Sequence, residues 1–143
     1  MKELGPAISA RTVRVAKLRE FTRRAFESTG LSRTDAEAGA EVLVTTDAWG
    51  VFTHGTKSLP GYLRRLQAGG LRTTGRPTVV AEGPSWTMMD GGSALGMVTS
   101  TSAMECAIAK AKSAGVAYVG VRNSCHFGAA GYYAWLAARQ GQI

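Results

Sequence analysis

The stretch VAYVGVRNSCHFGAAGYY (residues 116–133) decides the fold class. Residues 116–121 are almost entirely apolar, which is typical of a strand buried on both faces. A polar turn follows this run, and a helix is expected over residues 129–139. A long helix is also expected before the strand, over residues 97–113, with a stripe of alanines suited to close packing on a sheet. This order of helix, strand, turn and helix is half of an α/β layer.

Two short β-type runs precede the long helix. They cover residues 78–81 and 86–89, are separated by Glu-Gly-Pro-Ser, and predict a hairpin or two adjacent strands. Residues 141–143 resemble the approach to a further strand. One buried strand and a weak hairpin do not complete a sheet, so the α/β domain is expected to be unfinished within this chain. The other strands would come from a longer polypeptide or from a partner chain.

The first half of the chain predicts helices. A frayed lead-in is expected over residues 1–12, and amphipathic patterning predicts helices over residues 16–28 and 56–68. Between them, Ser32 is a plausible N-cap for a helix that runs to about Trp49. The predicted fold is therefore α/β. A helical amino-terminal region (residues 1–77) is followed by the first part of a mixed-sheet α/β domain (residues 78–143).

Composition and charge limit the classes of partner that this protein can bind. The 143 residues are 45% hydrophobic, include 18 glycines and carry a formal net charge of +7. Such a balance fits nucleic acid, an anionic membrane surface, or a small anionic substrate with a phosphate-bearing cofactor. The basic residues near the start alternate with Leu18, Phe21 and Phe26, which favours the solvated face of an amphipathic helix over a nucleic-acid footprint. We expect neither a nucleic-acid nor a membrane partner.

Cysteine usage and the lack of long apolar runs indicate the compartment. The two cysteines, Cys106 and Cys125, have no metal-ligand spacing and form no disulfide framework, so no metal is expected. Cys125 is interpreted as a small spacer rather than a nucleophile. With no secretory leader and no apolar run near 18 residues, a cytoplasmic location is expected.

The only two histidines, His54 and His126, are the candidate chemical groups. Each lies on a glycine-bounded turn that opens a helix, where free N–H groups and the helix dipole favour carboxylates or phosphates. An ordinary turn residue is the alternative interpretation at each site. On the helix after His54, Lys57 could neutralise a carboxylate or simply be solvated, and Tyr62 could be a partly buried aromatic on the apolar face.

Three ordered motifs resemble the malate/L-lactate dehydrogenase family. This family of non-Rossmann oxidoreductases includes ureidoglycolate, sulfolactate, diketogulonate and piperideine-carboxylate enzymes. The first motif, in residues 45–70, consists of an acidic residue, Thr-His-Gly, a helix with a tyrosine, and Ala-Gly-Gly. The second, in residues 89–96, contains Asp-Gly-Gly and Ala-Leu-Gly. The third, in residues 121–133, contains Arg-Asn-Ser-Cys-His-Phe-Gly followed by Gly-Tyr-Tyr. The resemblance covers roughly residues 12–143. Family members are more than twice as long, so it implies an amino-terminal part.

The resemblance implies a reaction and roles for site residues. The reaction is hydride transfer between NAD or NADP and a small 2-hydroxy or 2-oxo acid, by an enzyme expected to be a homodimer. His54, with Thr53 as relay partner, or His126 would be the acid/base. Tyr62, Lys57 and Ser58 would contact substrate. The cofactor would contact the turn formed by Phe127, Gly128, Ala129, Ala130 and Gly131.

One departure from the family pattern concerns the substrate. Where the family commonly has an arginine that binds the substrate carboxylate, this chain has Ser58, which cannot form a bidentate ion pair. Lys57 could act as a point charge, although adjacent helical positions point about 100° apart. Two other functions remain open: a truncated, non-catalytic remnant acting as a structural or interaction module, and a basic nucleic-acid-binding domain.

Overall fold

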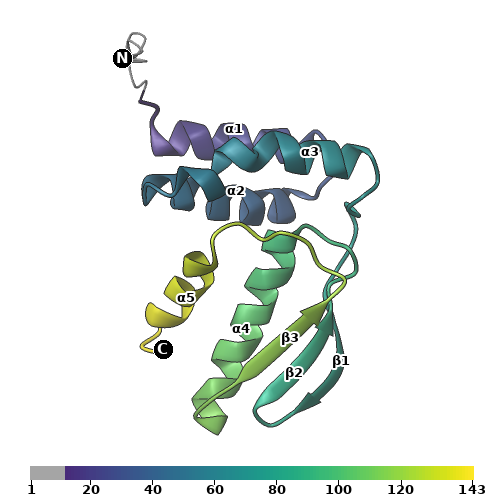
Figure 1. The fold of residues 1–143 in the computed structure, drawn as a ribbon, viewed down its shortest axis with the longest axis vertical. Coiled ribbons are helices and arrows are strands. Elements are labelled where there is room, and N and C mark those ends of the chain that lie inside the picture. The colour runs from purple at the N-terminus through teal and green to yellow at the C-terminus, as the bar shows by residue number, and fades with distance from the viewer. Residues whose placement is uncertain (1–11) are drawn as a thin grey trace, which may run out of the picture.

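The computed structural model describes residues 12–143, so most of the predicted lead-in lies outside the described residues. Figure 1 shows a layer of helices above a small sheet with two further helices. The predicted α/β class is confirmed. The elements are α1 (Val15–Glu27), α2 (Arg33–Ala48), η1 (Phe52–His54), η2 (Thr56–Ser58), α3 (Leu59–Gln67), β1 (Thr78–Gly83), β2 (Trp86–Asp90), α4 (Gly96–Ala114), β3 (Tyr118–Arg122) and α5 (Ala130–Ala138).

Helix α2 is the centre of the helical layer. It begins as predicted at Ser32, whose side-chain oxygen accepts a hydrogen bond from the Asp35 backbone N–H at 3.2 Å. This bond satisfies one of the unpaired amides of the first turn. The buried face of α2, which includes Val42 and Leu43, contacts α1 on one side and α4 and α5 on the other. Helix α2 therefore joins the two halves of the molecule.

The sheet has the order β1-β2-β3. Strands β1 and β2 form the predicted antiparallel hairpin, with an irregularity in register between Val79 and Ala81. Strands β2 and β3 are parallel and are connected through α4, which packs against both. Thr87 and Met89 of β2 are buried, and the Cys106 thiol of α4 lies 3.5 Å from the Thr87 hydroxyl. Helix α4 thus covers one face of the sheet.

One prediction about the second half of the chain is wrong. The apolar run at residues 116–121 is not buried on both faces: Val116 is 69% exposed and Tyr118 is 65% exposed, because the described residues supply a covering helix on only one side. The strand itself, β3, begins two residues after the start of the run and ends one residue after its end. Residues 141–143 follow the turn that ends α5, in which Gly141 adopts a φ of +72°, and their approach to a further strand stays a prediction.

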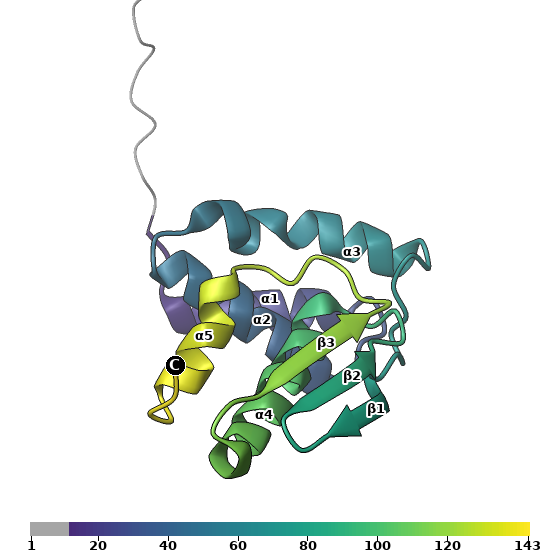
Figure 2. The ribbon, with the colours of Figure 1, turned by 60° about the horizontal axis from the view of Figure 1, so that its bottom comes forward.

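One buried core joins the helical region to the α/β region. It includes Phe26 of α1, Tyr62 of α3, Met97 of α4 and Tyr133 of α5. Residues on both sides of the predicted division at 77/78 therefore pack into a single cluster. Figure 2 shows that the segment from β3 to α5 runs beside α3. This packing brings two loops from distant parts of the sequence together.

Candidate functional site

The first loop of the site joins α2 to α3 and carries His54. The backbone forms two consecutive 3₁₀ turns, η1 and η2, in place of the start of the helix expected over residues 56–68. The Thr53 hydroxyl lies 2.9 Å from His54 Nδ1, and the Ser58 hydroxyl donates a hydrogen bond to the Thr53 carbonyl at 3.3 Å. The imidazole of His54 is exposed. Thr53 is therefore placed where a hydroxyl can orient the His54 ring.

Asp47 at the end of α2 holds this loop. Its Oδ2 accepts hydrogen bonds from the Thr56 backbone N–H at 3.0 Å and from the Thr56 hydroxyl at 2.5 Å. Gly55 packs so closely against the carboxylate that an added Cβ would lie 1.7 Å from Asp47 Oδ1. Asp47 is the acidic residue of the first motif, but sequence reasoning did not assign it a role. The structure assigns it the support of the His54 turn.

The second loop, residues 123–129, carries His126 and is fastened to the turn after β2. The Asp90 carboxylate accepts hydrogen bonds from the Gly92 backbone N–H at 2.9 Å and from the Asn123 amide at 2.7 Å. Asp90 also forms an ion pair with Arg122 at 2.9 Å. The Gly92 bond, followed by the Asn123 and Arg122 bonds, lowers the Asp90 pKa. The Asp-Gly-Gly motif therefore works as a clamp on the His126 loop.

The start of α4 and a tyrosine of α5 complete the support of this loop. The Gly96 backbone N–H donates to Cys125 Sγ at 3.2 Å, and a Cβ on Gly96 would lie 2.4 Å from the His126 carbonyl oxygen. The Tyr133 hydroxyl donates to the Phe127 carbonyl at 2.5 Å. Burial raises the pKa of the Cys125 thiol, which agrees with a packing role for this cysteine.

The two histidines meet where the loops meet. Their ring centroids are 5.6 Å apart, with an interplanar angle of 26°, in a stacked arrangement. Gly128, with a φ of +81°, allows this approach, because a Cβ there would lie 3.0 Å from Val42 and 3.8 Å from the His54 carbonyl oxygen. Both imidazoles are exposed at the surface of the described chain. The two imidazoles therefore belong to one site.

Tyr62 reaches the pair from α3. Its ring is 4% exposed, and its hydroxyl lies 2.5 Å from His126 Nδ1. Burial raises the pKa of Tyr62 to about 12, so the hydroxyl keeps its proton at neutral pH. Sequence reasoning missed this contact because the two residues are separated by 64 positions and no local pattern links them.

A cavity of about 350 Å³ opens beside the pair. Both histidines and Val51 line it. Four of the five predicted cofactor residues line it as well: Phe127, Gly128, Ala129 and Ala130. The fifth, Gly131, lies in the first turn of α5 and is exposed. None of the predicted substrate residues lines this cavity: Lys57 is exposed on η2, while Ser58 and Tyr62 form the hydrogen bonds described above.

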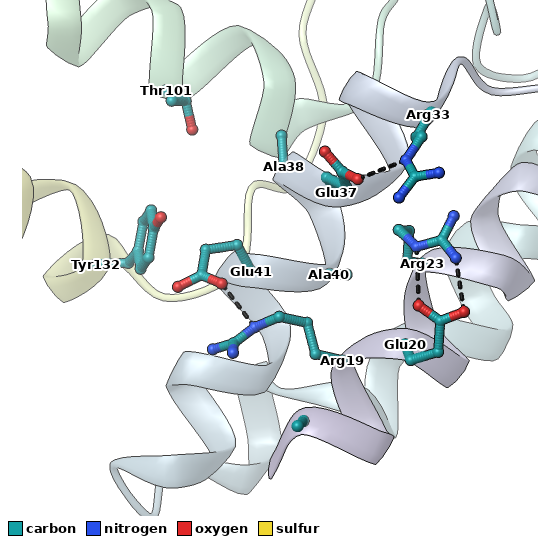
Figure 3. A pocket seen from close by; sticks show the side chains of 11 residues that line it. Arg19, Glu20, Arg23, Arg33, Glu37, Ala38, Ala40, Glu41, Thr101 and Tyr132 are labelled. Carbon is teal, nitrogen blue, oxygen red and sulfur yellow. Dashed lines mark hydrogen bonds and ion pairs between the residues drawn. The ribbon is translucent and has the colours of Figure 1, made fainter.

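A second groove, of about 570 Å³, lies between α1 and α2, with Tyr132 of α5 and Thr101 of α4 at its rim. Its charged side chains are paired with one another, as Figure 3 shows for Arg19 with Glu41, Arg23 with Glu20 and Arg33 with Glu37. Arg19 Nε lies 2.7 Å from Glu41 Oε2, but the angle at this contact does not suit a hydrogen bond, so the pair is held by charge alone. The arginines that line this groove are thus neutralised by neighbouring carboxylates.

Comparison with known proteins identifies the family. Residues 13–143 match the family model described as malate/L-lactate dehydrogenase, and the chain belongs to this family. Among curated relatives, a malate dehydrogenase of Pyrococcus abyssi is 38% identical over 133 residues, covering 92% of this chain. An L-sulfolactate dehydrogenase of Methanocaldococcus jannaschii is 40% identical over 114 residues, covering 80% of this chain.

The fold agrees with solved structures of the same class. The malate dehydrogenase from Pyrococcus horikoshii OT3 superposes with a TM-score of 0.91 over 99% of this chain, at 37% identity. The chain spans 37% of the length of the Pyrococcus abyssi relative and 41% of the Pyrococcus horikoshii structure.

Among residues 12–143, no helix is both long and apolar enough to cross a membrane. The same range contains no group of three or more histidine, cysteine, aspartate or glutamate side chains arranged to hold a metal ion.

Proposed function

We propose that the protein containing this chain is an oxidoreductase that interconverts a small 2-hydroxy acid and its 2-oxo acid with NAD or NADP. The observation that carries the proposal is the stacked pair of His54 and His126, which opens onto a small cavity. The names of the relatives, malate and sulfolactate dehydrogenases, support the substrate class. The family resemblance adds the expectation of a homodimer, and the cysteine usage adds that of a cytoplasmic location.

The histidine pair supplies the proton chemistry. Reduction of the 2-oxo acid adds a hydride to C2, the C=O π electrons move to the oxygen, and that oxygen takes a proton. An imidazole is the side chain whose ordinary pKa lies nearest to neutrality, so it can give this proton and recover it from solvent. In the oxidation direction, the same nitrogen takes the hydroxyl proton. Both rings line the cavity where this oxygen would lie.

The turn at residues 127–130 fits a nicotinamide ring. Gly128, Ala129 and Ala130 line the cavity with small side chains, which leaves space for a flat ring next to the histidines. When bound, the nicotinamide supplies or accepts the hydride at C2. Phe127 and Val51 lie on the same cavity and would exclude water from the reacting carbon.

Lys57 is the cation that we assign to the substrate carboxylate. It lies on η2, three residues after His54, and is exposed to solvent. The ammonium of a lysine acts as a point charge and does not need the planar geometry of a guanidinium. The Ser58 hydroxyl is hydrogen-bonded to the Thr53 carbonyl and so stays with the backbone of the loop.

Steady-state kinetics on the intact protein test the proposal. A panel of 2-oxo acids with NADH and NADPH is followed at the nicotinamide absorbance band. We expect turnover for at least one pair, and we expect His54→Gln and His126→Gln each to lower kcat by about 10²–10⁴-fold with an unchanged melting temperature. Gln67→Ala, an exposed change on α3, is the control and should keep full activity.

The possible outcomes separate the proposal from its alternative. If neither cofactor gives an absorbance change with any acid in the panel, the proposal is wrong and a non-catalytic structural or interaction module is favoured. If one histidine variant keeps a near-normal rate, that histidine is structural and the other carries the proton alone.

A further inference from the structure

His126 Nδ1 faces two hydrogen-bond donors. The Tyr62 hydroxyl lies 2.5 Å from it, and the Gly128 backbone N–H approaches it at 3.4 Å. A backbone N–H can only donate, so the nitrogen it approaches must be an acceptor. If Nδ1 carried a proton, the Gly128 N–H would face another N–H group, and Nδ1 could form a hydrogen bond only to the Tyr62 oxygen. The geometry therefore favours an Nδ1 without a proton.

The Tyr62 hydroxyl leads to the same conclusion. Burial disfavours its phenolate and raises its pKa to about 12, so the oxygen carries a hydrogen at neutral pH. A buried hydroxyl donor without an acceptor is destabilising by about 1–3 kcal/mol. His126 Nδ1 is the acceptor within its reach among residues 12–143. The hydrogen bond thus runs from the Tyr62 oxygen to the His126 nitrogen.

We propose that Tyr62 is a positioning residue that, together with the Gly128 amide, holds His126 as the neutral tautomer protonated at Nε2. The proton-bearing nitrogen is then the one on the opposite side of the ring from Tyr62. His126 meets the cavity as a hydrogen-bond donor of fixed orientation. Neither residue type nor spacing in the sequence distinguishes this tautomer from the other.

The catalytic consequence of this arrangement rests on the proposed dehydrogenase function. If His126 gave up its Nε2 proton, Nδ1 would have to take the Tyr62 proton, and the raised pKa of the buried phenol opposes that transfer. His126 therefore donates a hydrogen bond to the substrate oxygen and retains its proton. The proton that completes the hydroxyl then comes from a ring nitrogen of His54, whose N–H bond breaks as the O–H bond forms.

Nitrogen NMR of the chain tests the tautomer without turnover. Uniformly ¹⁵N-labelled protein at pH 8 gives long-range ¹H–¹⁵N correlations for the two histidines. We expect His126 to show an unprotonated, pyridine-like Nδ1 and a protonated, pyrrole-like Nε2. A protonated Nδ1 on His126 would overturn the proposal. Because no substrate is present, this result is independent of whether the dehydrogenase proposal holds.

Tyr62→Phe tests the role of the hydroxyl. It removes one of the two donors, so we expect the tautomer protonated at Nδ1 to become populated, with the His54 signals unchanged. Tyr133→Phe is the matched control: it removes a buried hydroxyl that is bonded to the Phe127 carbonyl, next to His126, but does not touch the ring. An unchanged tautomer in Tyr62→Phe, or the same change in Tyr133→Phe, would contradict a specific role for Tyr62.

A different probe keeps the proposal testable if Tyr62→Phe does not fold, and kinetics add a further test if it does. Fluorotyrosine, a more acidic phenol, should shift His126 Nδ1 and leave His54 unshifted; equal responses or none would count against the Tyr62 bond. In an active enzyme, Tyr62→Phe should lower kcat about tenfold to a hundredfold while the KM for the nicotinamide stays within twofold. A change confined to KM would indicate a substrate contact for Tyr62.

Discussion

The two histidine loops are held in place by different means. The His54 loop is fastened locally: Asp47, at the end of the preceding helix, bonds both polar groups of Thr56. The His126 loop is fastened from a distance, by Asp90 and Gly96 near the start of the α/β region and by Tyr62 on a helix of the other region. The first loop depends on one short motif, and the second depends on the whole fold.

Gly96→Ala is expected to disturb the support of the His126 loop more than any other change considered. The new Cβ would overlap the carbonyl oxygens of Cys125 and His126, which are backbone atoms that cannot step aside. We expect the free energy of unfolding to fall by about 1–3 kcal/mol and activity to fall with it. Urea denaturation measures this change. Gly61→Ala is the control, because nothing lies within 4 Å of its Cβ position, and it should stabilise α3 by about 0.5–1 kcal/mol. Equal effects of the two changes would contradict this account of Gly96.

Asp47→Ala removes the carboxylate that holds the His54 loop. Losing the acceptor of the Thr56 N–H resembles losing a helix cap, so we expect about 0.5–2 kcal/mol of lost stability. Activity should fall roughly tenfold, because a displaced His54 no longer meets the reacting atom. Asp47→Asn keeps an acceptor oxygen and should recover most of the rate, while Glu37→Ala, an exposed change on the same helix, should be neutral. A rate for Asp47→Asn as low as that for Asp47→Ala would show that charge, and not position, matters.

Lys57→Gln sharpens the comparison by testing what the local loop binds. The change removes an exposed charge from η2, so we expect the KM for the 2-oxo acid to rise about two- to fivefold with kcat nearly constant. The KM should also lose most of its dependence on salt concentration. Lys17→Gln, an exposed change on α1, serves as the control. An unchanged KM in Lys57→Gln would show that Lys57 does not bind the substrate carboxylate.

Asp90→Asn gives the smallest expected effect and concerns pH. Because the Asp90 pKa in the folded state lies below its ordinary value of 3.8, the ionised clamp stabilises the fold above that value and loses its effect as the pH falls through the folded pKa. The native protein should therefore lose more melting temperature than Asp90→Asn between pH 6 and pH 3. Parallel pH dependences in the two proteins would show that the clamp contributes nothing to stability.

Local patterns predicted the local structure well. The Ser32 cap, the hairpin and the long helix before β3 follow from side-chain hydrogen bonding and apolar periodicity, and the structure contains them. The exposure of β3 could not be predicted from its own residues. An apolar run predicts burial, but it does not say which elements cover each face of the strand. The bond from Tyr62 to His126 also escaped prediction, since only tertiary packing brings these residues together.

The shared core has a consequence for folding. Tyr62, Met97 and Tyr133 belong to one buried cluster although they lie far apart along the chain. Contacts at such separation form only after large loops have closed, and loop closure is the slow part of folding for chains of this kind. We therefore expect the histidine stack to form together with the core and to be lost when the core opens. The imidazole pair would then report on the unfolding of the whole cluster.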